Sequence, residues 1–332
     1  MKKNNVPLRI GVAGLGRIAQ AHLDAVRSLP DEHAIVTAVA TRKSPPPVEL
    51  EDAVTVHPDF EGLLSDPAVD AVIICYPNAM HLDAVLAAVH AGKHVLVEKP
   101  IGMNAGEVEE MVAAADHKRV TLMSAQSRRF SDAIEGVRDA LPEIGPVFRV
   151  TINFLVQFDE PPTPWWQTPS EAGELVIHLQ GSHSVDTIVW LLAAEPTWVA
   201  ARHACVNPNF GGPDEADMLL GFSDNTMASV HLSLNTKPYH HEMIVVGAHG
   251  SLRMKEYPTG VPFGVGYHLE VNGTTRVQGP QEPSIYAKQL AEFVTAVRDR
   301  REPIASGREL LRTTRALDAV ITAARTGETV RL

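Results

Sequence analysis

The chain has 332 residues, and at roughly 150 residues per domain this length predicts two domains. Apolar residues make up 45% and charged residues 21%, the mixture of an ordinary globular protein. The formal net charge is −11, so we expect binding to neither nucleic acid nor anionic membranes. We find no signal-peptide pattern, no bilayer-length apolar run and no metal-binding cysteine spacing, and therefore expect a cytoplasmic protein without a metal.

The first part of the chain alternates short apolar runs with helical patterns. Strands are predicted over Leu8–Ala13, Ile35–Ala40, Val69–Cys75, His94–Val97 and Val120–Met123. Helices are predicted over Arg17–Ser28, His81–His90 and Asn104–His117. The apolar runs are mostly unbroken, as in strands that are covered on both faces. This β-α alternation predicts an α/β domain over residues 1–124, with a doubly wound parallel sheet of the Rossmann type.

The pattern changes after about residue 125. Arg149–Gln157 alternates apolar and polar side chains, which is typical of a strand with one solvated face. Further strands are predicted over Met218–Phe222, Met227–Leu234, Met243–Val246 and Leu269–Val271, and helices over Leu175–Leu192, Ser284–Arg300 and Arg308–Thr326. Residues 125–332 are therefore predicted to form an α+β domain on a large, mostly antiparallel open sheet.

A glycine-rich turn follows the first predicted strand and opens the first predicted helix. Gly14 permits a tight turn, Gly16 lets the backbone approach a pyrophosphate, and Ala19 keeps the helix close to the strand. Arg17 and Ile18 start the helix, whose free N–H groups favour an anion. In this context of strand, turn and helix, the pattern predicts a dinucleotide site.

The end of the second predicted strand indicates which dinucleotide is bound. An acidic residue there would hold the ribose hydroxyls of NAD, whereas this chain has Thr41, Arg42 and Lys43. A hydroxyl and two cations favour the 2′-phosphate of NADP, because Arg offers a planar fork of donors. A solvated basic loop remains the alternative, and NAD remains possible.

Two further motifs carry groups that suit proton and hydride chemistry. Lys99 lies between Glu98 and Pro100, at the carboxyl end of the predicted strand His94–Val97, where it could donate to a substrate oxygen. Alternatively, Lys99 is a surface residue before a helix. His183 lies inside the predicted helix Leu175–Leu192, on one face with Gln180 and Asp186. A lone helical histidine can also be structural.

The chain contains, in this order, the motifs Gly14–Ala19, Tyr76–His81, Glu98–Pro100, Arg129-Phe130, Trp165-Trp166, Gly181–Asp186, Glu292–Val294 and Arg301–Pro303. Together these motifs make the chain resemble the Gfo/Idh/MocA oxidoreductase family over nearly its whole length. The resemblance implies hydride transfer between a nicotinamide cofactor and a carbinol carbon, usually of a sugar or cyclitol. It also implies a homodimer or homotetramer formed through the open sheet of the second domain.

The resemblance further implies roles for individual residues. Lys99 would hydrogen-bond the reacting oxygen, and His183 would take or give its proton, a task that suits imidazole near neutral pH. Trp166 would reach the cofactor and the substrate from the second domain. Asp186 and Gln180 are candidates for substrate binding because they share the helix face of His183, and this choice does not come from the resemblance. Besides the glycine-rich turn and the basic tip, which is the segment Thr41–Lys43, the positions that would hold the cofactor are Tyr76, Pro77, Asn78, His81, Glu98, Lys99, Arg129 and Trp166.

One position departs from the family pattern. Members commonly carry an Asp four residues before the histidine, where this chain has Leu179. This difference leaves open a different sugar, a less polar carbonyl or lost activity. Two other functions therefore stay open: glycoside processing through transiently reduced bound NAD, and dinucleotide or sugar sensing without catalysis.

Overall fold

The computed structural model describes residues 6–332, which form two compact units. The first unit contains the chain up to Gly102, Gly106–Ser127 and Pro283–Leu310. The second contains Met103–Ala105, Arg128–Glu282 and Leu311–Leu332. Compared with the division predicted at residue 124, the segment 283–310 returns to the first unit, because helix α8 (Ile285–Asp299) packs against helix α1 (Ala19–Ser28).

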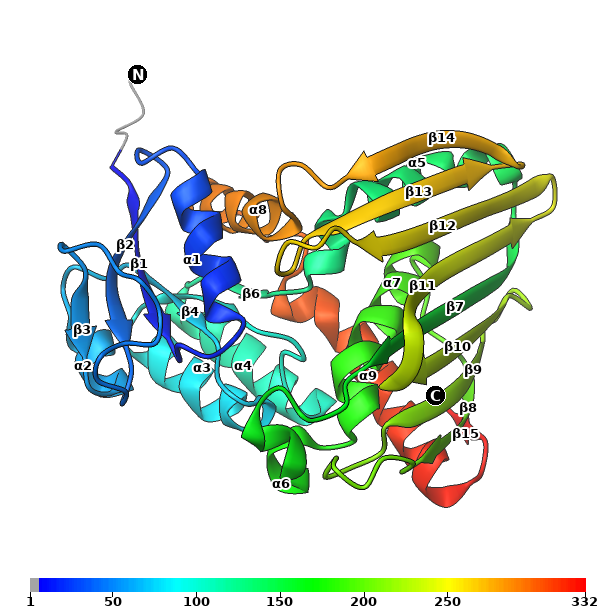
Figure 1. Ribbon diagram of the computed structural model, residues 1–332, viewed down its shortest axis with the longest axis horizontal. Helices are drawn as coiled ribbons and strands as arrows, with labels where there is room; N and C mark the ends of the chain where they lie inside the picture. Colours follow the sequence, from blue (N-terminus) through cyan, green and yellow to red (C-terminus); the bar gives the residue numbers. More distant parts are fainter. Residues whose placement is uncertain (1–5) are drawn as a thin grey trace. The chain divides into compact units, whose positions relative to one another are not determined.

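The first unit is built on a six-stranded parallel sheet with the order β3-β2-β1-β4-β5-β6. Its strands are β1 (Leu8–Ala13), β2 (Ala34–Ala40), β3 (Thr55–His57), β4 (Ala71–Ile74), β5 (His94–Val97) and β6 (Leu122–Ser124). Helices α1 and α8 lie on one face, and the other carries α2 (Phe60–Ser65), α3 (His81–His90) and α4 (Ala105–Lys118) (Figure 1). The Rossmann prediction is confirmed, although β3 and α2 were not predicted.

The second unit is built on a nine-stranded sheet with the order β14-β13-β12-β11-β7-β10-β9-β8-β15. Its strands are β7 (Val147–Gln157), β8 (Trp198–Ala204), β9 (Glu215–Gly221), β10 (Met227–Ser233), β11 (Asn235–Gly247), β12 (Gly250–Pro258), β13 (Val265–Val271), β14 (Thr274–Pro280) and β15 (Val330–Arg331). Strands β7 and β10 pair in parallel, and all other neighbours are antiparallel. The predicted mostly antiparallel sheet is therefore confirmed.

Helices cover one face of the nine-stranded sheet. Helices α5 (Asp132–Ile144), α7 (Ser182–Leu192) and α9 (Gly307–Thr326) contribute side chains to one continuous core with the inward side chains of the strands. In Figure 1, α5 and α7 lie behind β7 and β11–β13, and no helix of residues 6–332 covers the opposite face. The alternating burial of β10 follows from this one-sided cover.

The remaining helical segments are short. They are η1 (Asn78–Met80), η2 (Ser127–Phe130), η3 (Pro164–Gln167), α6 (Pro169–Ala172) and the π-helical turn η4 (Ile177–Gly181). Throughout residues 6–332, no helix combines the length and the apolar character that a bilayer crossing requires.

Candidate active site

The turn between β1 and α1 has the backbone geometry of a phosphate cradle. Gly14 has a φ of +84°, and a Cβ there would lie 2.8 Å from the Tyr76 ring and 2.9 Å from the Cys75 carbonyl oxygen. A Cβ at Gly16 would meet nothing within 4 Å. Glycine at position 14 is therefore required by the turn, whereas glycine at position 16 leaves open space above the backbone. Ala19 is fully buried at the start of α1 and allows the close helix–strand approach.

The basic tip follows β2 directly beside this turn. The Gly14 amide donates to the Ala40 carbonyl at 3.2 Å, which joins the turn to the end of β2. The Lys43 amide donates to the Thr41 hydroxyl at 3.1 Å and orders the tip. Arg42 and Lys43 are exposed. Arg42 is close enough to oppose the burial that raises the pKa of Tyr76 to about 12. The tip thus presents cations beside the phosphate cradle.

The segments after β4 and β5 are joined through a buried histidine. His81 is fully buried, with Nδ1 2.7 Å from the Pro100 carbonyl oxygen and Nε2 3.0 Å from that of Tyr76. Burial lowers the pKa of His81 despite these two contacts, so the neutral ring donates to only one carbonyl. Asn78 is also buried. These contacts show His81 as a support for the backbone of both segments, and its predicted cofactor contact stays a prediction.

Glu98 and Lys99 lie at the carboxyl end of β5. One Glu98 carboxylate oxygen lies 2.8 Å from His22 Nε2, and the other accepts from the Lys99 amide at 3.1 Å. Burial alone would raise the pKa of Glu98, but the hydrogen bond with His22 and the charge and amide of Lys99 outweigh it and lower the pKa. The Lys99–Pro100 peptide is cis, and the Lys99 side chain is half-buried. An ionised Glu98 therefore anchors the backbone that carries Lys99.

In the second unit, the predicted regular helix Leu175–Leu192 is wrong over η4. Ile177–Gly181 forms a π-helical turn, and the α-helix α7 begins at Ser182. The wider turn invalidates the uniform 100° spacing between His183 and the preceding residues, including Leu179 and Gln180. Hydroxyl groups of Ser182 and Ser184 donate to the carbonyls of Leu179 and Gln180, at 3.4 and 3.1 Å, and satisfy acceptors at this junction.

Asp186 lies three residues after His183 on α7. Its carboxylate accepts from Arg129 Nε at 2.9 Å and Nη2 at 2.7 Å, and from the Thr313 hydroxyl at 2.9 Å. The side chains of Arg129 and Asp186 are 2% and 1% exposed. The two motif residues thus form one buried bidentate ion pair, which ties η2 to α7. Substrate contact by Asp186 and cofactor contact by Arg129 stay predictions.

Arg128 and His241, which the sequence did not suggest as site residues, line a cavity with His183. Thr187 lines the same small cavity. The Arg128 guanidinium pairs with the buried Glu256 carboxylate, which also lies 2.7 Å from His241 Nδ1. Burial and the neighbouring Arg128 cation lower the pKa of His241 well below its usual value, so neutral His241 donates to Glu256. His241 and Glu256 face each other across β11 and β12, a register that the sequence did not predict.

The other predicted substrate residues lie in the interior of the second unit. Trp166 is buried against the rings of Phe158, Trp165 and Phe210, with centroids 5.2, 6.1 and 6.2 Å away. Buried Gln180 donates to the Ser233 carbonyl at 3.4 Å, and its side-chain oxygen has no hydrogen-bond partner among the described residues. Roles of Trp166 and Gln180 toward a ligand stay predictions.

Comparison with known proteins agrees with this arrangement of two units. Residues 8–126 match the family described as "Oxidoreductase family, NAD-binding Rossmann fold", and residues 140–253 match the "GFO/IDH/MocA C-terminal domain". The chain belongs to the Gfo/Idh/MocA family. It is an oxidoreductase that uses a nicotinamide cofactor, and the open space at Gly16 beside the tight Gly14 turn fits the pyrophosphate of such a cofactor.

Individual relatives extend over most of the chain. The 1,5-anhydro-D-fructose reductase of Ensifer adhaerens is 31% identical over 276 residues, which cover 82% of each chain. The D-xylose 1-dehydrogenase (NADP(+)) 2 of Haloferax volcanii is 27% identical over 334 residues, 97% of this chain and 98% of that one. The crystal structure of the aldose-aldose oxidoreductase from Caulobacter crescentus, complexed with glycerol, has a TM-score of 0.83 and 25% identity, covering 98% and 100%.

Proposed function

We propose that the protein transfers hydride between NADP(H) and a carbinol or ketone carbon of a sugar, cyclitol or related small molecule. The observation that carries the choice of NADP is the basic tip Thr41–Lys43, which lies beside the Gly14 turn without an acidic residue. The 2′-phosphate of NADP carries negative charge that the Arg42 fork and Lys43 would bind. An acidic tip, as NAD would require, is absent from this part of the described chain.

Side chains of this protein polarise the reacting oxygen of the substrate and transfer its proton. When bound, the nicotinamide supplies the two-electron acceptor or donor. Lys99 would donate a hydrogen bond to the reacting oxygen and stabilise its negative charge. His183 would take the hydroxyl proton during oxidation and return it during reduction. Glu98 would hold the Lys99 backbone, because its carboxylate accepts from the Lys99 amide.

The polar contacts near His183 bear on the class of substrate. Leu179 replaces the usual Asp and is buried in the apolar core, so it offers no hydrogen bond to a substrate hydroxyl. The named relatives act on 1,5-anhydro-D-fructose and D-xylose. We therefore place sugars and their keto derivatives first among candidate substrates, with the less hydroxylated ketones among them favoured by Leu179.

The cofactor proposal is tested by titrating nucleotide-free protein with NADPH and NADH. We expect wild-type protein to bind NADPH more tightly, and Arg42→Asp to lose that preference. Lys237→Asp is a control for the change in charge, since Lys237 is a 71% exposed side chain in the second unit. Equal affinities in the wild type, or an unchanged preference in Arg42→Asp, would refute the assignment of NADP.

We further infer a cytoplasmic homo-oligomer assembled through the open face of the nine-stranded sheet. The free cysteines Cys75 and Cys205 support the cytoplasmic location. Leu219, an apolar residue that is 42% exposed on β9, supports the assembly. Light scattering after size exclusion tests the assembly: we expect Leu219→Glu to dissociate it, whereas a monomeric wild type would refute it.

A further inference from the structure

The first unit contains a cavity of about 690 Å³ at the amino ends of strands β5 and β6. It is lined where β5 begins at His94 and where Arg119–Leu122 leads into β6. The Gly14–Ala19 turn instead follows the carboxyl end of β1. Because all six strands are parallel, the two places lie at opposite ends of the strands. The cavity is therefore separate from the proposed cofactor site.

The cavity concentrates cations in an acidic protein. Arg119, Arg300, Arg301 and Arg308 line it, against two carboxylates, Asp116 and Glu302. The chain as a whole has a formal charge of −11. Helix C-termini at α4 and α8 each add roughly half a negative charge, which the start of α9 partly offsets. The lining therefore keeps a net positive charge.

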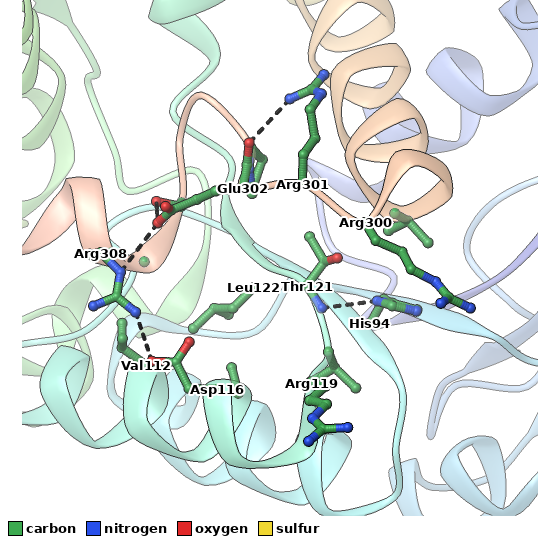
Figure 2. Close-up of a pocket in the computed structure, with 16 residues that line it drawn as sticks. His94, Val112, Asp116, Arg119, Thr121, Leu122, Arg300, Arg301, Glu302 and Arg308 are labelled. Carbon is green, nitrogen blue, oxygen red and sulfur yellow. Dashed lines mark hydrogen bonds and ion pairs between the residues drawn. The ribbon is translucent and has the colours of Figure 1, made fainter.

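Two of these arginines are paired with carboxylates, and the other two are not. Arg301 binds the Glu292 carboxylate at 2.7 and 2.6 Å, and Arg308 binds Asp116 at 2.7 Å and lies 3.5 Å from Glu302. Figure 2 shows the contacts of Arg308 as dashed lines, and it shows none for the side chains of Arg119 and Arg300. Within residues 6–332, those two guanidinium groups have no ion-pair partner.

The backbone holds both uncompensated arginines at helix ends. Arg119 follows α4 with a φ of 57°, and Arg300 follows α8 with a φ of 52°. Glycine or asparagine is the usual residue at such left-handed positions. Arginine there also offsets the helix dipole, which is a purely structural reason for a cation. Two such arginines on one cavity nevertheless give it charge that no carboxylate neutralises.

His94 adds a neutral donor to the same cavity. The Thr121 amide donates to His94 Nδ1 at 2.9 Å, so the ring proton of the neutral histidine lies on Nε2 (Figure 2). Burial lowers the pKa of His94 and keeps the ring neutral. The remaining wall is apolar where Val112, Leu122 and Val297 line it. Guanidinium forks and an N–H donor suit phosphate oxygens, and the apolar wall suits an organic group.

We propose that this cavity is a second anion site, which binds a small phosphorylated organic molecule through Arg119, Arg300 and His94. Its volume lies within the range of roughly 300–1,000 Å³ that is common for small-molecule sites, so there is room for more than a bare phosphate. The proposal goes beyond hydride transfer and depends on neither the cofactor nor the substrate assigned above.

Equilibrium dialysis with labelled inorganic phosphate and labelled glucose 6-phosphate tests the proposal. The test variant is Arg119→Asn/Arg300→Asn, because asparagine tolerates both left-handed positions. The control variant is Arg276→Gln/Arg331→Gln, which removes the same charge from exposed strands of the second unit. Arg42→Asp reports any anion bound at the dinucleotide site. Circular dichroism verifies that each variant is folded.

We expect saturable binding of both probes to the wild type, with glucose 6-phosphate the tighter of the two. The Asn double variant should bind each at least tenfold more weakly, and the other two variants should bind as the wild type does. Absence of saturable binding, or equal weakening in the control, would overturn the proposal. Loss in Arg42→Asp instead would assign the anion to the dinucleotide turn, and equal affinity for the two probes would refute the organic group.

Discussion

The buried pair Arg129–Asp186 gives the sharpest prediction about stability. Its two side chains are 2% and 1% exposed, and two hydrogen bonds of 2.9 and 2.7 Å join them. Asp186→Asn keeps the volume but leaves the guanidinium without its counter-charge. Breaking a buried pair in this way costs about 3–5 kcal/mol. For a unit of this size we expect the melting temperature to fall by roughly 6–20 °C.

Tryptophan fluorescence measures the melting temperature of the second unit, which contains the ion pair. All four tryptophans (Trp165, Trp166, Trp190 and Trp198) lie in the second unit, together with the ion pair. Asp139→Asn is the matched control, because Asp139 pairs with Arg138 on the surface with side chains 71% and 45% exposed. It should cost about 1 kcal/mol at most.

A second variant separates the cost of an unpaired buried charge from the loss of the ion pair itself. Arg129→Met/Asp186→Leu replaces both charges by apolar groups and should recover much of the stability that Asp186→Asn loses. An Asp186→Asn melting temperature no lower than that of Asp139→Asn would refute the reasoning from burial.

Two further predictions concern the pH dependence of stability and the Gly14–Ala19 turn. Because burial and Arg128 lower the pKa of His241, the unfolded chain binds a proton below about pH 6.5 that the folded chain does not. The free energy of unfolding should therefore fall as pH drops below 6.5, by up to ~1.4 kcal/mol per pH unit for this residue. Urea unfolding of His241→Gln should show a shallower fall, and superimposable pH profiles would contradict this. Gly14→Ala should destabilise the fold by about 1 kcal/mol or more, because position 14 has a φ of +84° and no space for a Cβ. Gly16→Ala should unfold like the wild type yet bind NADPH more weakly; equal stability of the two variants would count against the geometry of the turn.

The sequence predicted best those elements that are buried on both faces. The bounds of β1 and β5 agree with the prediction, because their apolar runs are unbroken. Helix α3 also ends where predicted, before Gly92 with its φ of +73°. Strand β3 was missed because its three residues lie largely at the surface, and the mostly exposed β14 gives no apolar signal.

The sequence could propose candidate site residues only where they lie in local motifs. Gly14, Lys99 and His183 each lie in a short motif next to an element boundary, so residue type and spacing were enough to propose them, and their roles stay predictions. The Arg129–Asp186 pair joins positions 57 residues apart, and Arg128 and Glu256 are 128 residues apart. Such partners depend on sheet register and helix packing, which periodicity does not specify. The π-helical turn before His183 likewise has no signature in the residue pattern.

The most direct test of the proposed hydride transfer is single-turnover oxidation of NADPH by Lys99→Met, with 1,5-anhydro-D-fructose and open-chain sugar ketones as substrates. Lys237→Met is the matched control, because Lys237 also precedes a cis proline but is 71% exposed. We predict that Lys99→Met binds NADPH like the wild type and loses at least a hundredfold in the rate of the chemical step, whereas Lys237→Met keeps it. An unchanged rate in Lys99→Met would contradict the role of Lys99 and, with it, the proposed mechanism.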